Sequence, residues 1–229
     1  MILLATLLLV IGLADFARPQ DRPADRAALT RSALVGALVA VLVVWGAGLA
    51  WWWVPIALVT VLAWVVSTPV DRVYPWPIVG LGLVVLIVLA GSAHAPTADG
   101  WLTDWYASLE VAALRDVSFE RFALTAACLV FLVESANIIV RMVLAGTDAG
   151  VMASEQTLKG GRVLGPIERI LIFAMALSGQ YAALTAVVAA KGILRFPEIS
   201  RDVAGRKAEY VLVGSFVSWA VALTFVPLL

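Results

Sequence analysis

The sequence is short of charged residues. Only 14% of its 229 residues are Asp, Glu, Lys or Arg, whereas about a quarter are charged in an average soluble domain. Hydrophobic residues make up 62%, and the mean hydropathy is +0.99. Acidic and basic residues balance at 16 each, so no basic excess points to nucleic acid as a partner. This composition favours an integral membrane protein over a soluble domain.

Residues for metal binding and covalent chemistry are equally scarce. The single cysteine, Cys128, cannot form an internal disulfide and lies in an apolar run, so we expect a small buried hydrophobe there. The single histidine, His94, does not supply the three or four ligands that zinc takes. Metalloprotease, phosphate-loop and nucleophile-elbow motifs do not occur. We therefore expect no cofactor or metal; a non-enzymatic function is favoured, and the question of catalysis stays open.

The hydrophobic residues fall into long segments. A helix needs about 20 residues, with a range of about 17–25, to cross a bilayer. The chain is predicted to be all-α and polytopic, with six to seven transmembrane helices near 1–14, 32–50, 54–69, 77–94, 121–144, 163–191 and 208–228. The first lacks a basic flank, so we interpret it as a short membrane helix, not a signal peptide. Three segments are expected: 1–98, a connector over 99–120, and 121–229.

The polar segments between these helices bear on location and orientation. Residues 101–120 mix tryptophan, leucine and charged residues, which predicts an amphipathic helix on the membrane surface. Basic residues gather in 15–31 and 191–207, and such segments favour the cytoplasmic side. Seven spans place the two segments on opposite sides, whereas six, which we favour, place both in the cytoplasm.

The fifth segment carries polar residues inside an apolar run. In a continuous helix, Glu134, Asn137 and Arg141 fall within about 60° of one another. A charged side chain at membrane depth costs about 2.5 kcal/mol or more. Such a side chain is therefore expected to face a partner, a cavity or an ion pathway. Glu134 is therefore a candidate ion or proton site, or one half of an ion pair with an arginine of the same or a neighbouring helix.

The sixth segment is expected to begin at Pro166, a residue suited to a first helical turn. Glu168 would then lie close to the helix N-terminus, where the helix dipole stabilises an acidic side chain. If the helix is unbroken, Arg169, Gln180 and Lys191 lie eleven residues apart on one face. Such a stripe indicates a bundle interior or a wet crevice, although the two cations near its ends can also extend to the interface.

Two further patterns concern the C-terminal third. Lys191 and Arg195 are four residues apart, before the helix end expected at Pro197, and are candidates for a phosphate or lipid headgroup contact or for membrane-edge anchoring. Gly214 and Ser218 have the spacing of small residues that allows another helix to approach closely.

Three ordered motifs resemble an uncharacterised bacterial membrane family, domain of unknown function 3307, mainly over residues 160–220. They are Gly161-Arg162-Val-Leu-Gly165-Pro-Ile-Glu168-Arg169, Ala189-Ala190-Lys191-Gly-Ile-Leu-Arg195-Phe196, and Glu209-Tyr210-Val-Leu-Val-Gly214-Ser215-Phe-Val-Ser218. The opening Leu13-Ala14-Asp15-Phe16 is similar too, but Ile11 stands where the family's histidine is expected. The resemblance implies a bacterial inner-membrane location and a common site for Glu168, Arg169, Lys191, Arg195, Glu209 and Tyr210. It implies no activity.

Three functions follow as hypotheses. The first is a small-solute or ion transporter or channel, or a subunit of one, in which Glu134 is the coupling acid. Asn137, Arg141, Glu168, Arg169, Gln180 and Lys191 would line its path. The second is a non-catalytic subunit of a membrane complex, and the third is a protein that binds lipid phosphates through Lys191 and Arg195. The expected partners are membrane lipids, with further copies of the chain or another membrane subunit.

Overall fold

The computed structural model describes residues 1–19, 25–69, 74–92, 96–145, 159–200 and 206–229, and these residues form helices and loops without a strand. The all-α prediction is thus confirmed. The chain divides into two compact units, Met1–Ser135 and Ala136–Leu229. This division differs from the three segments expected from the sequence, because the helix that begins at Phe119 packs with the N-terminal helices.

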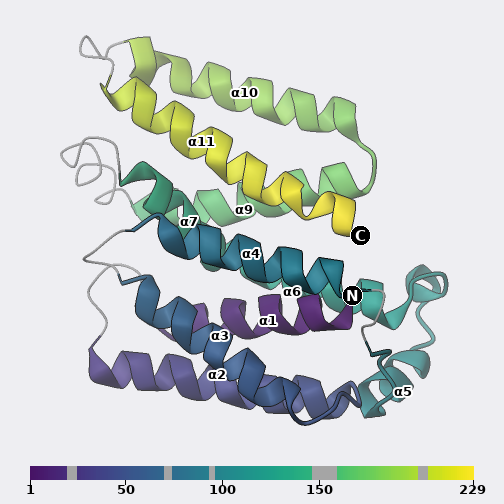
Figure 1. Ribbon diagram of the computed structural model, residues 1–229. Helices are drawn as coiled ribbons and strands as arrows, with labels where there is room; N and C mark the ends of the chain where they lie inside the picture. The colour runs from purple at the N-terminus through teal and green to yellow at the C-terminus, as the bar shows by residue number, and fades with distance from the viewer. Residues whose placement is uncertain (20–24, 70–73, 93–95, 146–158, 201–205) are drawn as a thin grey trace. The chain divides into compact units, whose positions relative to one another are not determined.

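The first unit is built around its first helix (Figure 1). The helices of this unit are α1 (Ile2–Phe16), α2 (Arg26–Gly46), α3 (Trp53–Ser67), α4 (Trp76–Ala90), α5 (Trp101–Ala107) and α6 (Phe119–Val133). Helix α1 packs against α2, α3 and α6 and is buried on almost every side, as a helix that is apolar all round tends to be. A Cβ at Gly12 would lie 2.9 Å from Val130 Cγ1. The glycine therefore lets α1 and α6 approach closely. Buried Cys128, also in α6, confirms the small hydrophobe expected there.

The turn after α2 is closed by a glycine in the left-handed region. Gly48 has φ 69°; its N–H donates to Trp45 O at 3.1 Å, and the N–H of Leu49 donates to Val44 O at 2.8 Å. These two bonds form the Schellman motif, which ends many helices at a glycine. A Cβ at Gly48 would meet the carbonyl oxygen of Asp99, so the turn also holds the backbone that leads into α5.

The surface helix expected over 101–120 is much shorter than predicted. Helix α5 ends at Ala107, and only a 3₁₀ turn, η2 (Ala112–Leu114), follows before α6. The Ser108 hydroxyl donates to Trp105 O at 2.6 Å, and Val111 is extended. Tyr106 donates its hydroxyl proton to Val117 O at 2.8 Å, which folds the segment back on itself.

The second unit contains α7 (Ser135–Leu144) apart from its first residue, α9 (Lys159–Leu177), α10 (Tyr181–Ser200), α11 (Arg206–Thr224) and the 3₁₀ turn η3 (Val226–Leu228). Helices α9, α10 and α11 pack against one another in pairs. The prediction of one helix over 163–191 is wrong, because the chain turns after Leu177. Gly179 has φ 70°, its N–H donates to Ala176 O at 3.1 Å, and the N–H of Gln180 donates to Met175 O at 2.8 Å. This second Schellman motif separates α9 from α10.

The fifth predicted segment is also interrupted. Helix α6 ends at Val133 and α7 begins at Ser135, with a bend of 46° between them. Glu134 is the residue at the break. The shared face calculated for Glu134, Asn137 and Arg141 assumed a continuous helix, so it does not hold across this break. Pro197 does not end its helix at residue 196 either, because α10 runs to Ser200.

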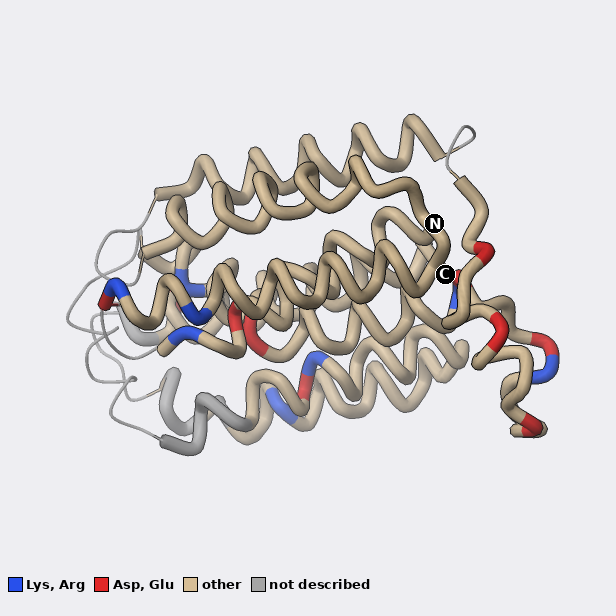
Figure 2. The backbone as a smooth tube through the Cα atoms, turned by 90° about the horizontal axis from the view of Figure 1, so that it is seen from below, with Lys and Arg blue, Asp and Glu red and all other residues tan. Residues whose placement is uncertain are grey.

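Two described helices are long and apolar enough to cross a membrane. They are α2 (Arg26–Gly46) and the stretch Ala208–Leu228, which joins most of α11 to η3. The bent α6–α7 pair would be a third. Helices α1, α3, α4 and the Tyr181–Leu194 part of α10 are apolar but shorter. Figure 2 shows long helical stretches without a charged residue. These lengths are compatible with a membrane protein.

Candidate functional site: two buried polar clusters

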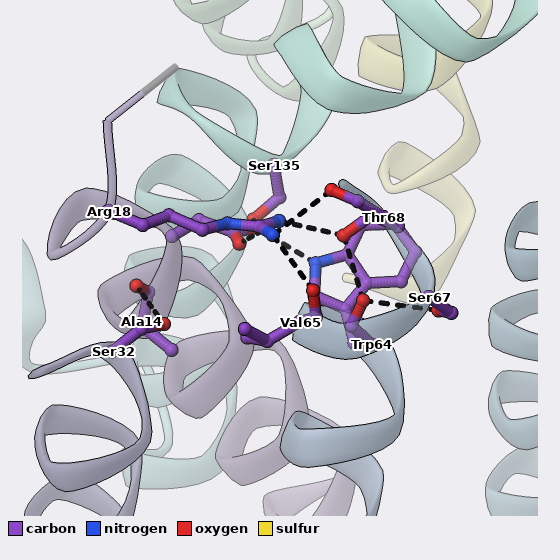
Figure 3. Close-up of polar contacts among 9 residues, drawn as sticks. Ala14, Arg18, Ser32, Trp64, Val65, Ser67, Thr68 and Ser135 are labelled. Carbon is purple, nitrogen blue, oxygen red and sulfur yellow. Dashed lines mark hydrogen bonds and ion pairs between the residues drawn. The ribbon is translucent and has the colours of Figure 1, made fainter. Parts of the chain in front are cut away.

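The first unit encloses a polar cluster at the C-terminal ends of α1 and α3 (Figure 3). This N-terminal cluster consists of Asp15, Arg18, Trp64, Thr68 and Ser135. Asp15 is fully buried, and its Oδ1 lies 2.7 Å from Arg18 Nη2. Its Oδ2 accepts hydrogen bonds from the Ser135 hydroxyl at 2.6 Å and from Trp64 Nε1 at 3.0 Å. Three segments far apart in the sequence therefore meet at one carboxyl group.

Arg18 also caps the end of α3. Its Nη1 donates to the carbonyl oxygens of Val65 at 3.2 Å and Thr68 at 3.1 Å, and its Nη2 donates to Thr68 Oγ1 at 2.8 Å. The last carbonyls of a helix have no partner within it and form the negative end of its dipole. A guanidinium group there satisfies both the hydrogen bonds and the charge.

The N-terminal cluster holds helices together. Arg18 is 6% exposed, so little of the pair is open to a ligand. Next to the cluster, the Ser32 hydroxyl donates to Ala14 O at 2.7 Å and ties α2 to α1. The sequence did not predict this site. The available signal was an acid and an arginine three residues apart at the end of an apolar helix, with the acid inside the Leu13–Phe16 motif.

The second unit contains an ion pair between the middle parts of two neighbouring helices. Lys191 of α10 donates from Nζ to Glu168 Oε2 of α9. Trp219 of α11 donates from Nε1 to Glu168 Oε1 at 2.9 Å, and its ring centroid lies 5.3 Å from Lys191 Nζ, within cation–π range. The side chains of Lys191 and Glu168 are 21% and 10% exposed. This pair is more accessible than Asp15 and Arg18.

Arg169 lies next to that pair in sequence and is 2% exposed. Its Nη2 donates to Asn137 Oδ1 of α7 at 2.5 Å, and its Nη1 donates to Ser218 Oγ of α11 at 3.3 Å. We call these residues the C-terminal cluster: Asn137, Glu168, Arg169, Lys191, Ser218 and Trp219. It links the four α-helices that the structure describes in this unit.

The structure corrects the roles predicted for Glu168 and Gln180. Helix α9 begins at Lys159 and contains Pro166, so Glu168 lies beyond the first turn and bonds to Lys191 and Trp219 instead of capping the helix. Gln180 is exposed at the turn between α9 and α10, because the Schellman motif ends the helix there. The stripe of Arg169, Gln180 and Lys191 on one helix face does not exist.

Glu134 and Arg141 are partly buried at the helix break and in α7. Arg195 belongs to α10, but its side chain lies outside the described part of the chain. A Cβ at Gly214 would lie 3.2 Å from Leu144 Cδ1, which confirms that this small residue allows a close helix approach. Glu209 is exposed near the start of α11.

The described residues contain no group of three or more histidine, cysteine or acidic side chains placed to hold a metal ion; His94 lies outside them. Comparison with protein-family models, curated proteins and solved structures finds no match to the chain. The resemblance over residues 160–220 therefore stays a prediction.

Proposed function

We propose that this chain is a multi-pass integral protein of the cell membrane that moves a small solute or ion and couples this movement to protons. The membrane location is supported by the apolar helices and by the large apolar side chains on their outer faces. Among the most exposed are Leu34, Trp45, Val66, Ile87, Ile193 and Leu194. In water such surfaces are costly, whereas lipid tails solvate them.

The observation that carries the transport proposal is the Glu168–Lys191–Trp219 arrangement. An ionisable residue inside an apolar helix is expensive and by default marks a pathway or a proton relay. Here an acid and a base lie together between three helices and remain partly accessible. A proton on Glu168 would weaken its attraction to Lys191, so protonation and separation of α9 from α10 would be coupled.

The break at Glu134 supports the same proposal. Transporters commonly build ion sites where a membrane helix is discontinuous, because freed backbone groups and helix ends can then face the site. Glu134 stands at such a discontinuity between two apolar helices. Glu134 is therefore a second candidate for the coupling acid, in addition to Glu168.

Proton flux in proteoliposomes tests this proposal. The protein is reconstituted with an internal pH-sensitive dye, and a potassium gradient with valinomycin sets the driving voltage. We expect wild-type protein to acidify the lumen faster than protein-free vesicles, and we expect Glu168→Gln and Glu134→Gln to abolish the excess. Glu110→Gln, which changes an exposed acid of the first unit, is the matched control and should retain wild-type flux. Equal flux in wild type, Glu168→Gln and Glu134→Gln would end the coupling proposal.

A second candidate function is a non-catalytic subunit of a membrane complex. It is favoured by the way Asp15 bonds to Arg18 and Glu168 to Lys191 within their own units, since such pairs can serve packing alone. Native mass spectra of the gently released protein distinguish this candidate. A defined higher mass, from further copies or another subunit, would support it, and a bare monomer would count against it.

Lipid-phosphate recognition has less support. The Lys191 ammonium group is already engaged by Glu168 and by the Trp219 ring, so a phosphate would have to displace a carboxylate.

A further inference from the structure

The first unit contains a cavity of about 460 Å³ between α1, α3 and α4. Its size falls within the range of about 300–1,000 Å³ that is typical of ligand pockets. The residues that define its walls include Leu3 and Thr6 of α1, Ala57 and Thr60 of α3, and Val84 and Ile87 of α4. The polar clusters described above do not contribute to it.

The walls of this cavity offer almost nothing to a polar ligand. The Thr6 hydroxyl donates to Ile2 O at 2.8 Å, and the Thr60 hydroxyl donates to Ile56 O at 2.9 Å. Each hydroxyl proton is therefore used within its own helix. Cavities lined by apolar groups stay dry, and a polar group placed there would lose its hydration without a replacement. The apolar lining therefore favours a hydrocarbon ligand over a polar one.

The cavity is open to the outside and begins at an aromatic end of the unit. Leu3 and Ala57 are 8% and 2% exposed, whereas Ile87 on the rim is 69% exposed. Trp53 borders the cavity next to the exposed Trp51 and Trp52, and such tryptophans gather at the level of lipid headgroups. From Trp53 to Thr60 the wall follows α3 for about 10 Å at 1.5 Å per residue. A chain that enters from the headgroup level could lie along it.

We propose that this cavity binds one acyl chain of a membrane phospholipid, inserted between α3 and α4 and reaching α1. Helix α4 buries only Pro77 among its own residues, so an acyl chain in the cavity would supply apolar contacts that the helix lacks within the unit. The inference rests on the membrane location proposed above and is independent of transport.

Photolabelling in lipid nanodiscs tests the proposal. The probe is a phosphatidylcholine with a diazirine on one acyl chain, and labelled residues are located by peptide mass spectrometry. We expect labels on Leu3–Leu7 of α1, a segment that other helices largely cover, as well as on exposed residues such as Val59. Val84→Trp and Thr60→Phe fill the cavity from its two walls and should abolish the α1 labels. Val79→Trp, on an exposed position of the same helix that does not line the cavity, is the matched control and should leave them unchanged.

The outcomes separate this proposal from the membrane proposal. Labels on exposed helix faces without labels on Leu3–Leu7 would overturn the acyl-chain site and leave the membrane location standing. An absence of acyl labels anywhere, or failure to enter nanodiscs, would count against both. Labels on Leu3–Leu7 that persist in both filling variants would also overturn the site, and agreement between the two variants guards against one of them misfolding.

Discussion

Each of the two polar clusters holds an acidic and a basic side chain among apolar helices, but the two clusters differ in how far these side chains are exposed. In the first unit, Asp15 and Arg18 are almost completely enclosed, and hydrogen bonds tie them to the C-terminal part of α3 and to Ser135. In the second, Glu168 and Lys191 are partly accessible and share one tryptophan. A closed pair is suited to fixing helices in place, whereas a partly open pair can respond to a proton or an ion. Under the transport proposal, the Glu168–Lys191 pair is therefore the one of the two pairs that would take part in proton movement.

Removing the cation from each pair gives the largest expected difference. Arg18→Met removes the cation that is paired with the fully buried Asp15 and should lower the free energy of unfolding by about 3–5 kcal/mol. Lys191→Met should cost about 1–3 kcal/mol, because Glu168 keeps its hydrogen bond from Trp219 and some solvent contact. Unfolding in detergent, followed by circular dichroism, measures both. Equal losses would remove the distinction between a closed and an open pair.

Among the described residues, two glycines have positive φ, Gly48 in the first unit and Gly179 in the second, and they extend the comparison to the backbone. Alanine at either position must adopt a left-handed conformation, which lowers the free energy of unfolding by about 1–2 kcal/mol. At Gly48 the new Cβ would also collide with the Asp99 carbonyl, whereas nothing lies within 4 Å at Gly179. We expect a total of about 2–4 kcal/mol for Gly48→Ala and only the conformational part for Gly179→Ala. A larger loss at Gly179 in the same unfolding experiment would contradict the described turn.

Matched tryptophan substitutions should give a smaller effect. Trp64→Phe removes a hydrogen bond to a carboxylate with no access to solvent, for about 1–3 kcal/mol. Trp219→Phe removes the bond to Glu168 but keeps an aromatic ring beside Lys191, so we expect about 0.5–1.5 kcal/mol. Proton flux should change only in Trp219→Phe. A flux defect in Trp64→Phe at unchanged helix content would show that the N-terminal cluster also takes part in transport.

The smallest effect is expected at Gln180. Its side chain is exposed at the α9–α10 turn, so Gln180→Ala should change stability by no more than about 0.5 kcal/mol and leave proton flux unaltered. A loss of flux would place this residue in the path after all.

Hydropathy predicted the helices well because a long apolar run has few alternatives to a buried or lipid-covered helix. It did not show where such runs are interrupted. The turn at Gly179 lies within a run that stays apolar on both sides, so only the glycine itself signalled the helix end. Glu134 resembles any intramembrane acid, and nothing in its neighbours predicted a break.

The partners of the charged residues were harder to predict than their positions. Glu168 and Lys191 were both singled out, but their contact depends on α10 folding back along α9, which the continuous helix excluded. Hydropathy ends the first apolar run at residue 14 and so places Asp15 and Arg18 in a loop. The extension of α1 to Phe16 brings the acid inside the unit. Which side chains a charged residue contacts depends on how the helices pack, and the periodicity of the sequence does not predict that packing.

The turn at Gly179 also changes the parity of the chain's path. If α2, α3, α4, the α6–α7 pair, α9 and α10 each cross the bilayer, six crossings separate the basic segment after α1 from the one after α10, instead of the five expected from the sequence. An even number returns the chain to the side from which it started. The arginines of both segments would then share one aqueous compartment without any apolar helix being withdrawn from the membrane, and a single glycine would reconcile the charge asymmetry of the whole sequence with its hydropathy.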